Sequence, residues 1–464
     1  MSDTVKLAEG RAVIDSGELA AFRGALQGAA LTPSDEGYDA ARRVWNGNID
    51  RRPALIVRCA GVADVRRAVD IARRHGLLLS VRGGGHSAPG YGTNDGGVVV
   101  DLSLMKTIEI DPVRRIARAG GGVLWLELDA ATQAHGLAVT GGTVSNTGIA
   151  GLTLGGGIGW LSGKHGATVD NLISAEVVTA DGRVLTANAT EHPDLFWALR
   201  GGGGNFGVVT SFEYQLHPVG EVLGGMVLYP LSAAGDVLRS YRDKVAALPD
   251  EAEANAALLT APDGSGPICA VLLGYNGPVK DGERVLASFR SFGAPLADTV
   301  GPMSYGARQV MLDEPNAVHG HHRYWRSAFT ERLSDDFLQV MIRGAGTFTS
   351  PMSALLMFYM HGAITRVPET ATAFAARRPQ WDIDVIGCWS NPAESAGHIG
   401  WVKDLWGQLE PHVKGSVYVN HLSADDNPAM VRASFGANHA RLRQVKATYD
   451  PNNLFRHNSN ILPT

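Results

Sequence analysis

The chain has 464 residues, which is enough for about two or three domains around a large apolar core and excludes a single small domain. Lysine and arginine total 41 against 46 acidic residues, a formal net charge of −5 with no basic stripe, so we expect no nucleic-acid partner. The chain opens without a continuous apolar signal region, and no later run approaches the roughly 18 apolar residues of a membrane span, so we expect a cytoplasmic protein without a membrane partner.

The cysteines and glycines narrow the class of protein further. Cys59, Cys269 and Cys388 are odd in number, far apart, and in no paired or metal-ligand spacing, which is typical of buried thiols in a reducing compartment. Glycine supplies 57 of the 464 residues, roughly 12% against the usual ~7%, and its excess gathers without a period between residues 83 and 207. This clustering indicates a ligand-binding half of the chain.

The first predicted elements lead to a glycine-rich loop. A helical piece covers residues 17–28, an apolar strand covers 54–57, and an amphipathic helix over 62–75 ends at Gly76. A strand is expected at residues 77–81, and the glycine-rich loop follows it directly. The first domain therefore begins near the strand at 54–57.

The loop after this strand is where we place the chemistry. Gly83, Gly84 and Gly85 remove every Cβ from one edge of the backbone, so main-chain N–H groups can approach a bulky anion. The guanidinium of Arg82 adds a permanent positive charge and a forked set of N–H donors suited to phosphate oxygens. His86 follows the glycines. From the residues alone, the favoured alternative is a flexible surface turn with a solvated histidine.

The elements that follow predict a mixed domain. Strands are expected at residues 98–102, 107–110 and 115–119, with an Asp-Pro turn joining the last two as a hairpin, and a helix at 124–135. Strands and helices at this irregular spacing indicate an α+β domain and not a regularly alternating doubly wound sheet.

Two further glycine clusters follow. Residues 141–159 interleave glycine with valine, isoleucine and leucine, as a backbone packed against a flat ligand would, whereas a disordered linker would be polar. Residues 202–207 match the dinucleotide pattern G-x-G-x-x-G, but the run follows an expected helix and leads into a strand. This order is the reverse of the dinucleotide-binding arrangement, so the match is weak.

Residues 222–411 are predicted to form a second domain. Glycine becomes less frequent there, and strands at 226–229, 270–275, 354–360 and 383–389 alternate with amphipathic helices such as 393–409. Three histidines in this region suggest a metal site, but no carboxylate or cysteine completes a ligand set, so we favour a solvated or interfacial turn for His319, His321 and His322.

The chain closes with a strand predicted at residues 415–422 and a helix at 431–447. Because side chains alternate along a strand, Tyr418 and Asn420 would share one face. From the residues alone, an ordinary polar face is the favoured interpretation.

Six stretches of the sequence resemble the berberine-bridge-enzyme-like, FAD-linked oxidases, and the resemblance runs from about residue 50 to the end. They are residues 82–87, 94–103, 141–159, 194–209, 418–420 and 449–461. The resemblance implies an α+β fold, in which a PCMH-type FAD-binding domain of two α/β subdomains precedes an antiparallel-sheet substrate domain flanked by helices. The expected units are residues 1–49 (an N-terminal segment joining the FAD domain), 50–220 (FAD domain), 221–412 (substrate domain) and 413–464 (a segment returning to the FAD domain).

The resemblance also implies the cofactor and its contacts. FAD would be bonded covalently to His86, and by this bond alone, because Val144 stands where many relatives carry a second, cysteine link. Tyr418 would be the catalytic base and Thr147 would lie beside the route of oxygen. The other implied flavin contacts are Arg82, Gly83, Gly84, Gly85, Ser87, Tyr91, Ser103, Gly142, Thr143, Gly148, Gly151, Gly155, Gly156, Gly157, Gly159, Asn205, Gly207, Val208, Asn420 and Asn458.

The reaction implied is removal of hydride from a small organic substrate to the flavin, while Tyr418 takes a proton and O2 is reduced to H2O2. Ala88, Ile158 and Ala376 depart from the plant-type pattern, so plant substrates are not transferred, and alcohols, amines, phenols and secondary metabolites all stay open. Two alternatives also stay open: a dehydrogenase with a non-oxygen acceptor, and a non-enzymatic glycine-rich binding protein. The group that activates Tyr418 and the oligomeric state are not predicted.

Overall fold

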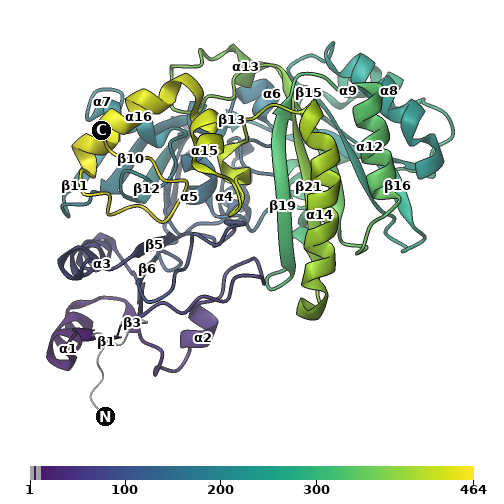
Figure 1. Cartoon of the computed structure of the whole chain (residues 1–464). Coiled ribbons are helices and arrows are strands. Elements are labelled where there is room, and N and C mark those ends of the chain that lie inside the picture. Colours follow the sequence, from purple (N-terminus) through teal and green to yellow (C-terminus); the bar gives the residue numbers. More distant parts are fainter. Residues whose placement is uncertain (1–4, 7–11) are drawn as a thin grey trace.

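The computed structural model describes residues 5–6 and 12–464, and in these residues the chain folds around three large sheets (Figure 1). Two sheets form one half of the molecule together with the chain's last helices, and the third sheet with its covering helices forms the other half. Sheets and helices are mixed without regular alternation, which confirms the α+β class.

The first sheet carries the glycine loop at one strand end. Its order is β3 (Ala29–Leu31), β4 (Leu55–Arg58), β6 (Val98–Asp101) and β5 (Leu79–Arg82), with β4 and β5 parallel to β6. Residues of β6 are buried throughout, as parallel strands covered on both faces should be. The accompanying elements are β1 (Val5–Lys6), β2 (Ala12–Ile14), α1 (Ser16–Ala25), α2 (Tyr38–Ala41) and α3 (Val62–His75).

The helix α3 shows why this element could be predicted from the local sequence. Val65 and Val69 are fully buried, its arginines face outward, and Gly76 ends the helix with φ of 62° in the left-handed region. A residue with a Cβ adopts that conformation only with strain, so glycine is the natural stop.

The second sheet is antiparallel and has the order β11-β10-β12-β8-β7. The predicted hairpin of β7 and β8 is present. The strands are β7 (Ile108–Asp111), β8 (Ile116–Gly120), β10 (Leu172–Val178), β11 (Val184–Asn188) and β12 (Val208–Gln215); β9 (Leu137–Ala138) pairs separately with β13 (His217–Pro218). The helices are α4 (Trp125–Gln133), α5 (Ile149–Leu154), α6 (Ser162–His165) and α7 (Pro193–Leu199).

The third sheet is the scaffold of the second half. It is antiparallel with the order β17-β14-β16-β15-β20-β21-β19, and β18 also pairs with β14. One face packs under α8 (Ala234–Val245), α9 (Val279–Arg290), α12 (Asp335–Ala345) and α14 (Ser395–Leu409) in one apolar core (Figure 1). The strands are β14 (Glu221–Pro230), β15 (Ala252–Thr260), β16 (Pro267–Tyr275), β17 (Ala297–Asp298), β18 (Gly301–Ser304), β19 (His322–Thr330), β20 (Ala354–Met360) and β21 (Gln380–Trp389); the short helices are α10 (Tyr305–Gln309), α11 (Asp313–Asn316) and α13 (Ala363–Arg366).

The C-terminal segment lies against the first half, beside α7 (Figure 1). Two predictions for it are wrong. The strand expected at 415–422 is an extended approach followed by a 3-10 turn at Val419–His421, and the helix expected at 431–447 is two helices, α15 (Pro428–Phe435) and α16 (His439–Tyr449). Gly436 separates them because its φ of 53° ends the first helix.

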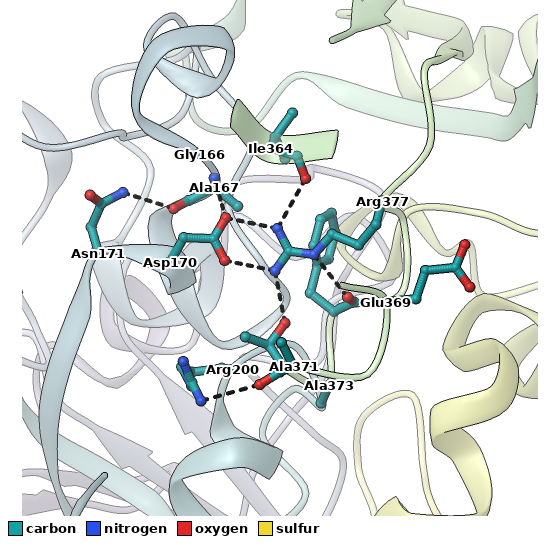
Figure 2. Close-up of polar contacts among 12 residues, drawn as sticks. Gly166, Ala167, Asp170, Asn171, Arg200, Ile364, Glu369, Ala371, Ala373 and Arg377 are labelled. Carbon is teal, nitrogen blue, oxygen red and sulfur yellow. Dashed lines mark hydrogen bonds and ion pairs between the residues drawn. The ribbon is translucent and has the colours of Figure 1, made fainter. Parts of the chain in front are cut away.

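A buried ion pair joins the two halves. Figure 2 shows the guanidinium of Arg377 facing the carboxylate of Asp170 through two hydrogen bonds of 2.7 Å each. Three residues before Arg377, the ring of Phe374 lies where a Cβ atom at Gly156 would be, and the Phe374 backbone lies where one at Gly201 would be. The ion pair of Arg377 and Asp170 therefore holds the segment that contains Phe374 against glycines of the first half.

No helix among the described residues combines the length and the apolar character that crossing a membrane requires.

Candidate active site

An elongated cavity lies between the two halves of the molecule. Its empty space, including open solvent at its mouth, is about 2030 Å³. Its walls come from the loop after β5, the segment before and through α5, the loop before β12, the face of the third sheet opposite its helices, and the C-terminal segment. Residues from nearly the whole length of the chain therefore meet around one space.

The glycine loop is held by a second glycine cluster. A Cβ at Gly84 would lie 2.3 Å from the backbone nitrogen of Gly148, and one at Gly148 would lie 2.3 Å from that of Gly84. Gly85 adopts φ of 72°. Two backbones can cross this closely only where both residues lack side chains, so the glycines build the cavity wall as well as leaving room for a ligand.

Most of the predicted flavin contacts lie on the cavity wall. With Tyr418 and His86, they are Arg82, Gly83, Gly84, Gly85, Ser87, Tyr91, Gly142, Thr143, Val144, Thr147, Gly148, Gly151, Asn205, Gly207, Asn420 and Asn458. The loop 202–207 joins α7 to β12, the helix-to-strand order expected from the sequence. Apolar side chains such as Leu102, Leu152 and Val209 complete the wall.

The guanidinium of Arg82 is occupied by protein groups. It donates to Asp101 Oδ2 at 2.7 Å and to the backbone oxygen of Ala41, while its methylenes lie under Gly85 and Gly92. In this structure Arg82 packs against the glycine loop and supports it. Direct binding of a phosphate by Arg82 stays a prediction.

Six predicted contacts do not line the cavity. Cβ atoms at Gly155, Gly156, Gly157 and Gly159 would meet Asn420, Phe374, Thr168 and the backbone of Gly141, so close packing of protein on protein explains these glycines. Ser103 donates its backbone N–H to Asp101, and Val208 is fully buried at the start of β12. A flavin contact at these six positions stays a prediction.

His86 is the group best placed to react with a ligand in the loop. Its Nδ1 lies 3.5 Å from Thr147 Oγ1, and its Nε2 is buried without a hydrogen-bond partner among the described residues. Burial, and then the neighbouring His319 and Arg323, lower the pKa of His86 to about 3. The imidazole is therefore neutral at physiological pH and keeps a lone pair for bonding.

Tyr418 and Asn420 meet although their segment is not a strand. The Tyr418 hydroxyl oxygen accepts hydrogen bonds from Asn420 Nδ2 and from the backbone N–H of Gly157, both at 2.8 Å. Burial raises the pKa of Tyr418 above its ordinary value, against the opposite effect of these two donors. Tyr418 is therefore a neutral phenol in the resting protein.

The sequence analysis missed a charged cluster on the same wall. His421 Nδ1 lies 3.1 Å from both Asp382 Oδ2 and Asp384 Oδ1, and His421 and Asp384 line the cavity. Burial alone would lower the pKa of His421, but the two carboxylates outweigh it and raise the pKa to about 10. Two acids alternating along a buried strand, Asp382 and Asp384, were the available signal.

Asp382, Asp384 and His421 also have the spacing of metal ligands, within 4.8 Å of one another. A protonated imidazole has no lone pair for a metal, so the raised pKa favours an ion pair here. The histidines considered for metal binding lie elsewhere: the ring of His319 meets that of His86 edge-on at 5.9 Å, and His322 contacts Asn48.

The three cysteines are free and buried, and none is on the cavity wall formed by the described residues. Burial raises the pKa of Cys59 and Cys388, and that of Cys269 to about 12. Val144, the residue that the resemblance predicts at the position of a second link, lies on the wall.

These residues fit an FAD. The glycine cradle offers backbone N–H groups without Cβ atoms in the way, the neutral His86 has an unpartnered nitrogen, and the cavity continues past an apolar stretch to Tyr418.

Comparison with known proteins agrees with this fit. One family model, described as an FAD binding domain, matches residues 53–188, and another, described as berberine and berberine like, matches residues 417–462. (R)-6-hydroxynicotine oxidase of Paenarthrobacter nicotinovorans is 32% identical over 456 residues, covering 94% of this chain and 97% of that protein. An FAD-linked oxidoreductase of Dictyostelium discoideum is 29% identical over 445 residues, covering 95% and 96%.

Solved structures show the same similarity. The crystal structure of 6-hydroxy-D-nicotine oxidase from Arthrobacter nicotinovorans matches with a TM-score of 0.85 and 31% identity, covering 95% of this chain and 98% of that one. Xylooligosaccharide oxidase from Myceliophthora thermophila matches with a TM-score of 0.83 and 23% identity over 96% and 98%, a likeness of fold.

Proposed function

The chain belongs to the berberine-bridge-enzyme-like family of FAD-linked oxidoreductases, and from this premise we propose that it is an oxidase that takes hydride from a small organic substrate, reduces O2 to H2O2 and holds FAD by one covalent bond to His86. The PCMH-type FAD-binding fold with an antiparallel-sheet domain, expected from the sequence, is present. The domain boundaries at residues 49, 220 and 412 stay predictions.

The observation that carries the proposal is that His86 and Tyr418 line one cavity. FAD, when bound, supplies the acceptor for two electrons, and the protein's part is to bind, orient and handle the proton. The glycine loops would hold its phosphates, His86 would hold its ring, and Tyr418 with Asn420 would meet the substrate.

Proton handling involves the donors around Tyr418. The N–H of Gly157 and the amide of Asn420 would stabilise negative charge on the Tyr418 oxygen, and we propose these two donors as the helper that the sequence does not identify. We keep Tyr418 as the proposed proton acceptor. Its raised pKa makes the Asp384 carboxylate, on the same wall, the competing acceptor.

The substrate class follows from the rest of this wall. Trp325, Leu356, Phe358 and Ile386 give it an apolar and partly aromatic surface, and Asp384 gives it an acceptor. We propose a compact substrate with an apolar ring and an alcohol, amine or phenol next to the oxidised carbon. The relative named above for 6-hydroxynicotine gives the first compound to try.

A cytoplasmic location is part of the proposal and rests on the three free, buried thiols, which fit a reducing compartment.

A substrate screen in air with a peroxide readout tests the oxidase, and a parallel screen with an artificial acceptor tests the dehydrogenase. Thr147 lies on the cavity wall and is small, which supports access of oxygen. We expect the substrate-reduced protein, mixed with air-saturated buffer, to reoxidise faster than turnover with the artificial acceptor. Slower reoxidation favours the dehydrogenase, and a purified protein without flavin absorption contradicts both enzymes.

A further inference from the structure

Trp45, which no motif singled out, contacts the proposed site of flavin attachment. Its indole ring stacks on the imidazole of His86, with ring centres 4.7 Å apart and an angle of 21° between the planes. The Trp45 side chain is buried and lies on the cavity wall, in the irregular stretch between α2 and β4. An aromatic side chain from another part of the chain thus lies flat against the histidine ring.

His86 needs such a support because its own backbone gives little. Three glycines precede it, and a glycine-rich backbone leaves the following side chain free to take many directions. Besides Trp45, the contacts of the imidazole include the long 3.5 Å approach of Thr147, the edge of His319 at 5.9 Å and the side chain of Asn146. The face of Trp45 is the closest flat contact among these.

Trp45 is itself fixed from both halves of the molecule. Its backbone N–H donates to Gly85 in the glycine loop at 3.1 Å, and its indole Nε1 donates to the backbone oxygen of Asn316 at 2.6 Å. The guanidinium of Arg323, at the start of β19, lies 3.9 Å from the centre of the Trp45 ring and also donates to the Trp45 backbone oxygen at 3.2 Å. A stacked, hydrogen-bonded indole of this kind cannot rotate freely.

We propose that Trp45, held by Arg323 and by Gly85 and Asn316, is a positioning residue that orients the His86 imidazole for formation of the covalent bond to FAD. The inference rests on the proposed attachment of FAD at His86. In that step a ring nitrogen of His86 bonds to the 8α-methyl carbon, one C–H bond of the methyl and the imidazole N–H are lost as two protons, and two electrons pass to O2, which leaves as H2O2. The oxidant is the acceptor of the proposed reaction.

A matched pair of variants isolates the stacking. Trp45→Phe and Trp45→Leu both lose the indole N–H and its bond to Asn316, but only the phenylalanine keeps a flat aromatic face. Trp401→Leu, on α14 and outside the cavity wall, controls for loss of a tryptophan elsewhere. Each apoprotein is mixed with FAD in air, bound FAD is measured on the native protein, and covalent flavin is measured by fluorescence on denaturing gels over time.

We expect Trp45→Phe and Trp401→Leu to attach flavin at nearly the wild-type rate. Trp45→Leu should bind FAD to the same extent but attach it at least about tenfold more slowly, because misplacing a reacting group by a fraction of an ångström has effects of this size. Attachment by Trp45→Leu at the wild-type rate, or equal slowing of the leucine and phenylalanine variants, overturns the proposal.

The pH profile of attachment gives a readout that a purely structural role would not move. The titratable and charged neighbours of His86 are His319 and Arg323, and with burial they lower the pKa of the wild-type imidazole to about 3. The wild-type rate should therefore be flat between about pH 5 and 8, whereas an exposed imidazole in Trp45→Leu should slow below about pH 6.5. A flat profile in both proteins counts against the proposal.

A measurement on the wild-type apoprotein covers the case in which both Trp45 variants fail to fold. In protein labelled at histidine, the His86 ring protons, assigned by their loss in His86→Ala, should be shifted by the ring current of Trp45. Unshifted His86 protons overturn the proposal. If the wild-type protein releases all its flavin on denaturation, the proposed covalent attachment itself fails, an outcome distinct from equal attachment by wild type and Trp45→Leu.

Discussion

The proposed chemistry depends on the hydroxyl oxygen of Tyr418, which accepts hydrogen bonds from two donors in different parts of the chain. One donor, the backbone N–H of Gly157, cannot be removed by a side-chain change. The oxygen itself can be removed.

Tyr418→Phe should keep the flavin spectrum and slow anaerobic reduction of the flavin by substrate at least about tenfold, the loss expected when a group acting on the transferred proton is removed. Rapid mixing without oxygen measures the rate. Asp384→Asn is the companion variant, because its carboxylate is the competing acceptor. Unchanged reduction in Tyr418→Phe with a large loss in Asp384→Asn transfers the role of base to Asp384.

The ion pair of His421 predicts how stability depends on pH. Its folded-state pKa of about 10 lies above the ordinary 6.5, so the pair stabilises the fold fully below about pH 6.5 and this contribution is lost as the pH rises toward 10. Wild-type protein should lose about 4 kcal/mol more unfolding free energy than His421→Gln between pH 6.5 and 10. Urea unfolding at several pH values measures this, and parallel slopes for the two proteins contradict it.

At the scale of elements, the crossing of the two glycine loops shapes the cavity. Gly84→Ala would place a methyl group 2.3 Å from the backbone nitrogen of Gly148, so one of the two loops must move. We expect a loss of about 2 kcal/mol or more in unfolding free energy, together with weaker FAD binding. Gly397→Ala, in α14 and with open space around the new Cβ, is the control and should be neutral or slightly stabilising. Equal stability of the two variants would show that the loops are less closely packed.

Local signals predicted the elements well where one pattern dominates. The helix α3 and its end at Gly76 were predicted from apolar residues spaced three or four apart and from a glycine that can adopt the left-handed conformation. The β7–β8 hairpin was predicted from its Asp-Pro turn. The C-terminal segment failed because alternation around Tyr418 looks the same in a short strand and in an extended approach to a 3-10 turn. There the Tyr418 segment is held by a distant contact, because the backbone N–H of Gly157, more than 250 residues away, donates a hydrogen bond to the Tyr418 hydroxyl.

The site was predictable where glycine and histidine occur together in one loop, as around His86. It was not predictable where partners come from distant segments. Gly155 to Gly159 are needed for packing against protein, and a sequence does not distinguish that need from contact with a ligand. The pairing of His421 with Asp384, and of Trp45 with His86, depends on segments that meet only in the fold.

At the scale of the whole molecule, the C-terminal segment returns to the first half (Figure 1). Both halves and this segment line one cavity. The ion pair of Arg377 and Asp170 joins the halves (Figure 2). It lies close to Phe374, whose ring meets that of Tyr418 edge-on at 6.0 Å. In the proposed arrangement the glycine loops and His86 of the first half hold the flavin, the third sheet faces the substrate, and the cofactor would be anchored through His86 alone.

That anchoring is the central claim, and mapping the flavin on the denatured holoprotein tests it most directly. Denaturing gels should show flavin fluorescence on the polypeptide, and proteolysis should give one flavin-bearing peptide that contains His86. The buried Cys59, Cys269 and Cys388, none on the cavity wall of the described chain, should carry no flavin. Flavin released by acid, or a second flavin bond mapped to a cysteine, would contradict the account.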